Sequence, residues 1–266
     1  GSGSYPNEFN ILHHDETDKI RDNLGYQLTN DQSKVLQDIT SDLTGEYVSQ
    51  RLIQGDVGSG KTIVAFLAMI DVALSGYQAA IMAPTEILAK QHAETGARLL
   101  EALGVRVAFL SGSLGGAQRS PLLKALKNGD INIVVGTHAL FSKSTVYKDL
   151  QLAVIDEQHR FGVTQRQAVV EKGRALLDES NKNVFVSPHL LMMSATPIPQ
   201  SLALTLYGDL DVSVIKSLPS GRKPITTYLV AQGHEANAYG AVLKELQKGR
   251  QAYFVYPSIG DDNLEA

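Results

Sequence analysis

The segment RLIQGDVGSGKT, residues 51–62, decides the fold class of this 266-residue chain. Its last eight residues, Gly55 to Thr62, satisfy the pattern G-x-x-x-x-G-K-[ST] between a short apolar run and an amphipathic helical stretch. Gly58 and Gly60 permit a close backbone turn, so consecutive N–H groups and the positive end of the helix can hold phosphate oxygens. The segment predicts strand, phosphate-binding turn and helix. The alternative is a flexible glycine-rich surface loop.

The turn supplies the candidate nucleotide-binding residues. In such a turn the lysine, here Lys61, reaches the β and γ phosphates, and the following hydroxyl, here Thr62, ligates Mg²⁺. The complete set from this segment is Gly55, Gly58, Ser59, Gly60, Lys61 and Thr62.

Outward from this segment, short apolar runs alternate with helical stretches. Runs such as INIVV and LAVID are apolar without alternation, which is typical of strands covered on both faces of a parallel sheet. We therefore predict a doubly wound parallel α/β sheet with helices on both faces. The predicted strands are 51–54, 79–83, 105–110, 131–135, 152–156 and 190–194, and the predicted helices are 31–43, 62–74, 86–103, 121–127, 164–177 and 198–207.

Two adjacent carboxylates, Asp156 and Glu157, end one of these strands. Since the chain turns at a strand end, both can reach the cavity beside the phosphate-binding turn. We expect Asp156 to hold Mg²⁺, partly through water, and Glu157 to orient or deprotonate the attacking water. The alternative is an exposed acidic turn.

Composition bounds the remaining possibilities. The chain is 43% apolar and 20% charged, as globular proteins are, and it has no cysteine, which excludes disulfides and thiolate chemistry. Its formal net charge of −4 means that any contact with nucleic acid depends on a local patch. No stretch is apolar enough to predict a membrane span.

The expected organisation has four parts. Residues 1–27 are read as an expression scar and an N-terminal linker, 28–218 as a first α/β lobe, and the turn-rich segment 219–224 as a linker. Residues 225–266 are read as the truncated start of a second lobe, since they offer strand, helix and strand in too few residues for a typical domain.

The motifs taken in order resemble those of superfamily 2 helicases of the DExH type, which have two RecA-like lobes. The strings that carry this resemblance are LTNDQ, the phosphate-binding turn, APTE, GTH, DEQH and SATP. Longer strings, including MAPTEILAKQH and DEQHRFGVTQR, are similar to bacterial helicases that act on branched DNA and reverse stalled replication forks. The resemblance covers about residues 24 to 257.

The resemblance implies ATP and Mg²⁺ as cofactors and assigns roles residue by residue. Gln32 would contact adenine, with Tyr26 stacking on it. Gln158, His159, Ser194 and Thr196 would couple the nucleotide state to movement of the lobes. The residues expected to contact the DNA backbone are Pro84, Thr85, Arg119, Gly136, Thr137, His138 and Arg160. For Arg160 a packed loop is the alternative.

The resemblance also implies a monomeric enzyme of the bacterial cytoplasm that binds branched or forked DNA and not membranes. A second lobe, with an arginine that completes the ATP site, and a wedge domain that grips the branch point would be missing here. Two other functions stay open: a P-loop motor on protein or another polymer, and a silent nucleotide-binding fragment. His13 and His14 could suggest a metal cluster, but a solvated turn is expected.

Overall fold

A computed structural model of the chain describes residues 6–7, 10–100, 103–105, 107–156, 163–177, 183–195 and 210–216. The elements, in chain order, are α1 (Asp15–Asp22), α2 (Asn30–Thr44), β1 (Gln50–Gly55), α3 (Lys61–Leu74), β2 (Gln78–Met82), α4 (Glu86–Leu100), β3 (Val107–Leu110), α5 (Gly116–Asn128), β4 (Ile133–Gly136), the 3-10 turn η1 (His138–Phe141), β5 (Leu150–Asp156), α6 (Val163–Val170), β6 (Arg174–Leu177), β7 (Asn183–Val186), β8 (His189–Ser194) and β9 (Asp211–Ile215).

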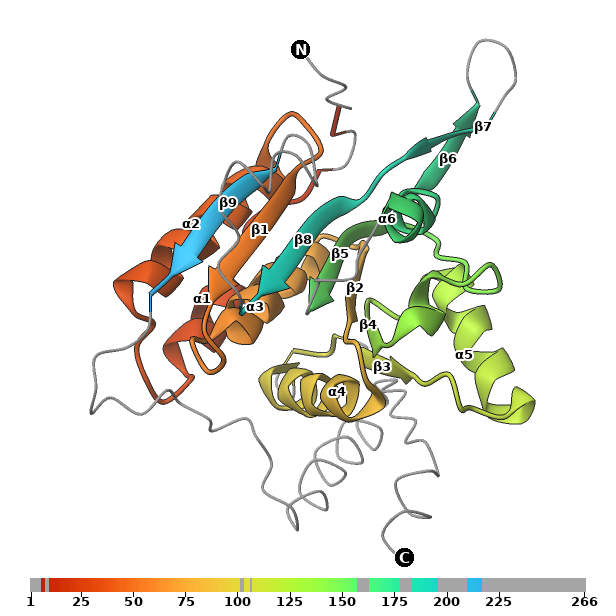
Figure 1. The fold of residues 1–266 in the computed structure, drawn as a ribbon, viewed down its shortest axis with the longest axis horizontal. Helices are drawn as coiled ribbons and strands as arrows, with labels where there is room; N and C mark the ends of the chain where they lie inside the picture. The colour runs from red at the N-terminus through yellow and green to blue at the C-terminus, as the bar shows by residue number, and fades with distance from the viewer. Residues whose placement is uncertain are drawn as a thin grey trace, which may run out of the picture.

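Among the described residues, the main sheet has seven strands in the order β3-β4-β2-β5-β8-β1-β9, and every neighbouring pair is parallel (Figure 1). Six of these strands are the six that the sequence predicts, with ends that differ by a few residues. The predicted doubly wound α/β fold is therefore confirmed. The seventh strand, β9, was not predicted; it pairs with β1 at the edge of the sheet.

The sheet is covered on both faces, because successive strand residues belong to two different apolar clusters. Ile53 of β1 packs in the cluster that includes buried residues of α1, α2, α3 and α4. Its neighbour Leu52 packs in the cluster that includes residues of α5, η1 and α6. This two-sided burial explains why the strand sequences are apolar without alternation.

One predicted helix is wrong in its second half. The helix expected over 164–177 ends at Val170, and a tight turn through Gly173 follows, with its N–H bonded to the Val170 carbonyl. The backbone of β6 then pairs antiparallel with β7. Backbone pairing with a later segment thus replaces helical hydrogen bonds, and helical periodicity alone does not reveal such a partner.

Helix α5 begins at Gly116, earlier than the predicted start at Pro121. The N–H groups of Gln118 and Arg119 both donate to the Gly115 carbonyl, so the first turn forms before the proline. Arg119 therefore lies in the first turn of this helix. The helix expected over 198–207, and the strands and helix expected between 225 and 256, lie outside the described residues.

Part of the range read as an N-terminal linker is helical and joins the core. Ile11 and the α1 residue Ile20 pack in the same cluster as α2 and α3. The carboxylate of Asp71 on α3, which is 3% exposed, accepts hydrogen bonds from the His13 ring (2.7 Å), the His14 N–H (3.0 Å) and the Thr17 hydroxyl (2.5 Å). The exposed His13 and the half-buried His14 are therefore anchored to α3, a contact that the sequence does not reveal.

None of the helices in the described part of the chain combines the length and the apolar character that a membrane crossing requires.

Candidate functional site

The predicted functional motifs meet along one edge of the main sheet, where its parallel strands end. The strand register places Met82 of β2 beside both Gly136 of β4 and Ile155 of β5. Asp156 lies beside Met193 of β8, and the next residue, Ser194, lies beside Gln54 of β1. In open α/β sheets this carboxyl edge is where ligands bind. Motifs that are far apart in the sequence therefore lie at the same edge of the sheet.

The phosphate-binding turn has the backbone conformation that its glycines predict. Gly58 and Gly60 have φ angles of 81° and 88°, in the left-handed region that favours glycine. A Cβ atom at position 60 would also lie 1.9 Å from Nε2 of Gln32, so no side chain fits there. Helix α3 begins immediately afterwards at Lys61, so its N-terminus, the positive end of the helix dipole, lies at the turn.

The polar side chains of the turn are positioned for a phosphate ligand. The Lys61 ammonium donates to the backbone carbonyl of Gly55 and to that of Asp56 at 3.1 Å, so it folds across the mouth of the turn. The Ser59 hydroxyl is buried and has no hydrogen-bond partner within the described part of the chain. Thr62 is half-buried in the first turn of α3. This donor set suits phosphate oxygens and a hard cation.

Gln32, the predicted adenine contact, packs directly against this turn. Its amide nitrogen donates to the Ser59 carbonyl at 2.8 Å, and its amide oxygen accepts from the Thr29 N–H at 2.9 Å. The second bond belongs to a capping box at the start of α2, in which the Thr29 hydroxyl accepts from the Gln32 N–H. Tyr26, the predicted stacking residue, is half-buried just before α2.

Asp156 has a partner that the sequence analysis missed. The His92 Nε2 on α4 lies 2.6 Å from the Asp156 Oδ2, and both side chains are mostly buried. An ionised carboxylate can only accept, so the imidazole donates. The sequence shows only that His92 shares a helix face with the small residues Ala89, Ala93 and Gly96. The structure buries this face, and a buried polar residue usually has a partner.

The loop between β2 and α4 carries two predicted DNA contacts, and both are exposed. Pro84 and Thr85 follow the end of β2, and Thr85 caps α4, since its hydroxyl accepts from the Leu88 N–H at 3.2 Å. The next residue, Glu86, accepts from the Ser111 hydroxyl at 2.8 Å and from the Gly112 N–H at 3.1 Å. Glu86 thus ties this loop to the glycine-rich loop that precedes α5.

The end of β4 lies beside these loops. A Cβ atom on Gly136 would lie 2.4 Å from the Leu110 carbonyl oxygen, so glycine is required for the close approach of β3. Thr137 is half-buried and His138 is exposed at the start of η1, while Arg119 is half-buried on the first turn of α5. The structure therefore brings six of the seven predicted DNA contacts to this end of the sheet.

Ser194 ends β8 and is 6% exposed. The remaining predicted site residues, Glu157, Gln158, His159, Arg160 and Thr196, lie outside the described residues.

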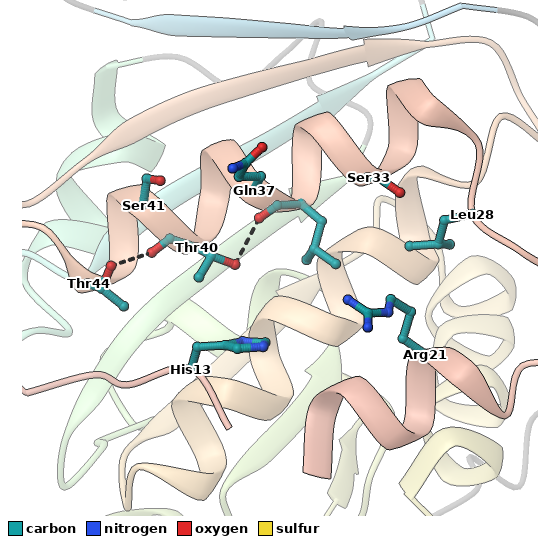
Figure 2. A pocket seen from close by; sticks show the side chains of 9 residues that line it. His13, Arg21, Leu28, Ser33, Gln37, Thr40, Ser41 and Thr44 are labelled. Carbon is teal, nitrogen blue, oxygen red and sulfur yellow. Dashed lines mark hydrogen bonds between the residues drawn. The ribbon is translucent and has the colours of Figure 1, made fainter. Parts of the chain in front are cut away.

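A separate pocket of about 350 Å³ lies between the N-terminal segment and α2 (Figure 2). Figure 2 shows His13 and Arg21 on one side and the polar face of α2 on the other, where the Thr40 and Thr44 hydroxyls donate to carbonyls of their own helix. None of the predicted nucleotide-binding residues lines it. The pocket is therefore distinct from the candidate site.

The chain is similar to known helicases. The model of the family described as DEAD/DEAH box helicase matches residues 29–204. The protein named ATP-dependent DNA helicase RecG is 54% identical in Treponema pallidum, over 92% of this chain and 35% of that protein. The protein of the same name in Aquifex aeolicus is 46% identical, over 93% of this chain and 30% of that protein. The chain thus spans about a third of the length of these relatives.

A solved structure described as RecG bound to a three-way DNA junction superposes with a TM-score of 0.63 and 36% sequence identity. The superposition covers 94% of this chain and 31% of the other.

Proposed function

The chain belongs to the DEAD/DEAH box helicase family, and on that premise we propose that it is the nucleotide-binding lobe of an ATP-dependent DNA helicase that acts on branched DNA. Because the chain spans about a third of its relatives, the proposal concerns a longer protein in which this lobe works with a second lobe and a DNA wedge domain. We expect that protein to act as a monomer in the bacterial cytoplasm, as the resemblance implies.

The observation that carries the proposal is the arrangement at the carboxyl edge of the sheet. The phosphate-binding turn follows β1, Asp156 ends β5, and Ser194 on β8 lies between them. Phosphate oxygens would replace the backbone carbonyls that the Lys61 ammonium now contacts, and they would give the buried Ser59 hydroxyl a partner. A bare glycine-rich surface loop would need neither the buried hydroxyl nor the neighbouring carboxylate.

Hydrolysis would use the side chains around this turn. Thr62 and Asp156 are the residues that would hold Mg²⁺, an ion that neutralises charge on the transferred phosphoryl group when bound. Lys61 would contact the β and γ phosphates, and Glu157 would orient or deprotonate the attacking water. Gln32 would contact adenine from its position against the turn, with Tyr26 stacking on the base.

DNA would be held by the neighbouring strand ends. Pro84, Thr85 and His138 are exposed there, and backbone N–H and hydroxyl groups of such loops can bind phosphates without reading sequence. With a net charge of −4 the whole chain does not attract DNA, so contact depends on this local edge. A branched substrate is supported by 54% identity to a RecG protein and by superposition on RecG bound to a three-way junction.

ATP hydrolysis by the full-length protein tests the proposal. We expect branched DNA to stimulate hydrolysis more than linear duplex of the same length, and Lys61→Ala to abolish hydrolysis. The matched control is Lys127→Ala, because Lys127 is exposed in the last turn of α5, which leads back to the opposite edge of the sheet. This control should hydrolyse ATP at the wild-type rate.

Each open alternative has its own outcome in this experiment. A rate that branched DNA leaves unchanged, but another polymer raises, would assign the chain to a different P-loop motor. A nucleotide titration without saturation, together with no hydrolysis, would leave only a silent fragment.

A further inference from the structure

The hydrogen bond between His92 and Asp156 joins two parts of the proposed site that have different ligands. His92 is 7% exposed, and its Nε2 lies 2.6 Å from Oδ2 of a residue 64 positions later in the chain. The Asp156 carboxylate has two oxygens, and His92 donates its hydrogen bond to Oδ2. In this arrangement Oδ1 is the oxygen that would serve a magnesium ion in the proposed nucleotide site.

The helix that carries His92 begins at the DNA-facing loop. Thr85 caps α4, with the Ala89 N–H donating to its carbonyl at 3.0 Å, and His92 follows two helical turns later, a rise of about 10 Å. Glu86 fastens the same first turn to the loop after β3 through Ser111 and Gly112. A phosphate bound at either loop would therefore act on the start of α4.

Helix α4 is closely packed on either side of His92. Ala89 and Ala93 are buried in the core, and a Cβ atom on Gly96 would lie 2.7 Å from the Phe66 ring of α3. Helix α4 is thus packed directly on the helix that starts at Lys61. A close-packed interior shifts as a unit rather than deforming locally. Displacement at Thr85 consequently reaches His92.

We propose that His92 is a positioning residue that couples the DNA-facing start of α4 to the Asp156 carboxylate. By donating to Oδ2 it holds the carboxylate in one orientation, in which Oδ1 would be the oxygen that holds Mg²⁺. DNA bound at the Thr85 loop moves α4 and thereby adjusts that orientation. The inference rests on the proposed function, since it assumes that Asp156 serves a Mg²⁺-dependent ATP site.

The effect of such a partner can be estimated. Outer-shell hydrogen bonds to metal-binding carboxylates contribute roughly 10–100-fold to metal affinity or activity. A histidine that only filled space would not influence the magnesium requirement. The concentration of Mg²⁺ at half-maximal activity therefore separates a positioning role from a packing role.

The test uses the full-length protein with three substitutions. His92→Leu removes the donor, His92→Gln keeps an amide donor at similar reach, and His92→Asn keeps a donor that is too short. For each we measure kcat and KM for ATP against Mg²⁺ concentration, with and without branched DNA. Binding of Mn²⁺ to the complex with a non-hydrolysable ATP analogue, followed by electron paramagnetic resonance, gives a readout independent of turnover.

We expect His92→Leu and His92→Asn to raise the half-saturating Mg²⁺ concentration and the Mn²⁺ dissociation constant roughly 10-fold or more. Both should also lose most of the stimulation by DNA, while the KM for ATP at saturating Mg²⁺ changes little. His92→Gln should recover much of the wild-type behaviour. Gln91→Ala, one residue earlier on α4, should match wild type.

Two results would overturn the inference. The first is a folded His92→Leu variant whose Mg²⁺ requirement and DNA stimulation match those of wild type. The second is that His92→Gln and His92→Asn have the same Mg²⁺ requirement and DNA stimulation. The second result overturns the inference even if His92→Leu does not fold. In either case loss of hydrolysis in Lys61→Ala would leave the proposed function standing. If wild type shows no DNA-stimulated hydrolysis, the proposed function itself fails.

Discussion

The side-chain amide of Gln32 donates a hydrogen bond to the backbone carbonyl of Ser59 over 2.8 Å, which joins the first turn of α2 to the phosphate-binding turn. The same amide accepts from Thr29 and closes the capping box of α2. Both ends of the amide are thus fixed beside Gly60. One side chain starts a helix and supports the turn that we propose to hold ATP.

Replacing Gln32 with alanine removes both of these bonds. We expect the free energy of unfolding to fall by about 1–2 kcal/mol, the usual cost of a lost cap and a buried hydrogen bond. The KM for ATP should rise several-fold, because the Ser59 carbonyl loses its support. Urea unfolding and ATP titration measure the two effects. Gln37→Ala, on the exposed face of α2, is the control, and equal KM values for the two variants would contradict the prediction.

Two glycines near the edge that we propose to face DNA offer a matched pair of alanine substitutions. At Gly136 a Cβ atom would meet the Leu110 carbonyl oxygen at 2.4 Å, and backbone cannot move aside easily. Gly136→Ala should therefore lower the free energy of unfolding by about 1–3 kcal/mol. Gly116→Ala, at the start of α5, meets nothing within 4 Å and should stabilise by up to about 1 kcal/mol. Denaturant unfolding of both variants measures the two effects. Equal unfolding midpoints for Gly136→Ala and Gly116→Ala would contradict the steric argument.

His189 should make the fold sensitive to acid. Burial lowers the pKa of its ring to about 4, and its Nδ1 accepts from the Ser49 N–H at 3.0 Å. The unfolded chain gains this proton near pH 6.5 and the folded chain only near pH 4, so the free energy of unfolding falls as the pH drops through this window. Over the whole window the free energy of unfolding falls by about 3 kcal/mol, because each unit of difference between the two pKa values corresponds to about 1.36 kcal/mol.

His189→Asn, which keeps an acceptor for Ser49, should remove most of this pH dependence, whereas His138→Asn at an exposed position should not. Urea unfolding at pH 7, 5.5 and 4.5 measures the slope. An unchanged slope in His189→Asn would show that another group is responsible.

The contact of His13 with Asp71 should have the opposite pH dependence. Burial lowers the pKa of His13, but the Asp71 and Asp18 carboxylates outweigh it and raise the pKa above its ordinary value of 6.5. The stabilisation is fully present below pH 6.5 and is lost as the pH rises through the raised pKa. Amide hydrogen exchange, corrected for its intrinsic pH dependence, should show α1 better protected at pH 6 than at pH 9.

Asp71→Asn should reduce this difference, because it removes one of the two carboxylates that face His13, and it should weaken the bonds to His14 and Thr17. The control is Asp22→Asn at the end of α1, whose side chain is 69% exposed. Protection of α1 that stays the same at both pH values in wild type would disprove the ionic contact.

The amino-acid sequence alone predicts the parts of this protein whose determinants are local. Six strands of the main sheet and the phosphate-binding turn follow from apolar runs, glycine positions and the lysine after them. The structure confirms these strands and the doubly wound sheet. The roles of Lys61, Asp156 and the DNA-facing residues stay predictions, and the experiments above address them.

Only the tertiary structure decides which distant groups meet. Strand β9 pairs with β1, β6 pairs with β7 where a helix was expected, and His92 reaches Asp156 from another element. Periodicity reports which face of a segment is buried, because that depends on residues a few positions apart. It carries no information about the partner, since pairing across tens of residues depends on how all the layers pack together.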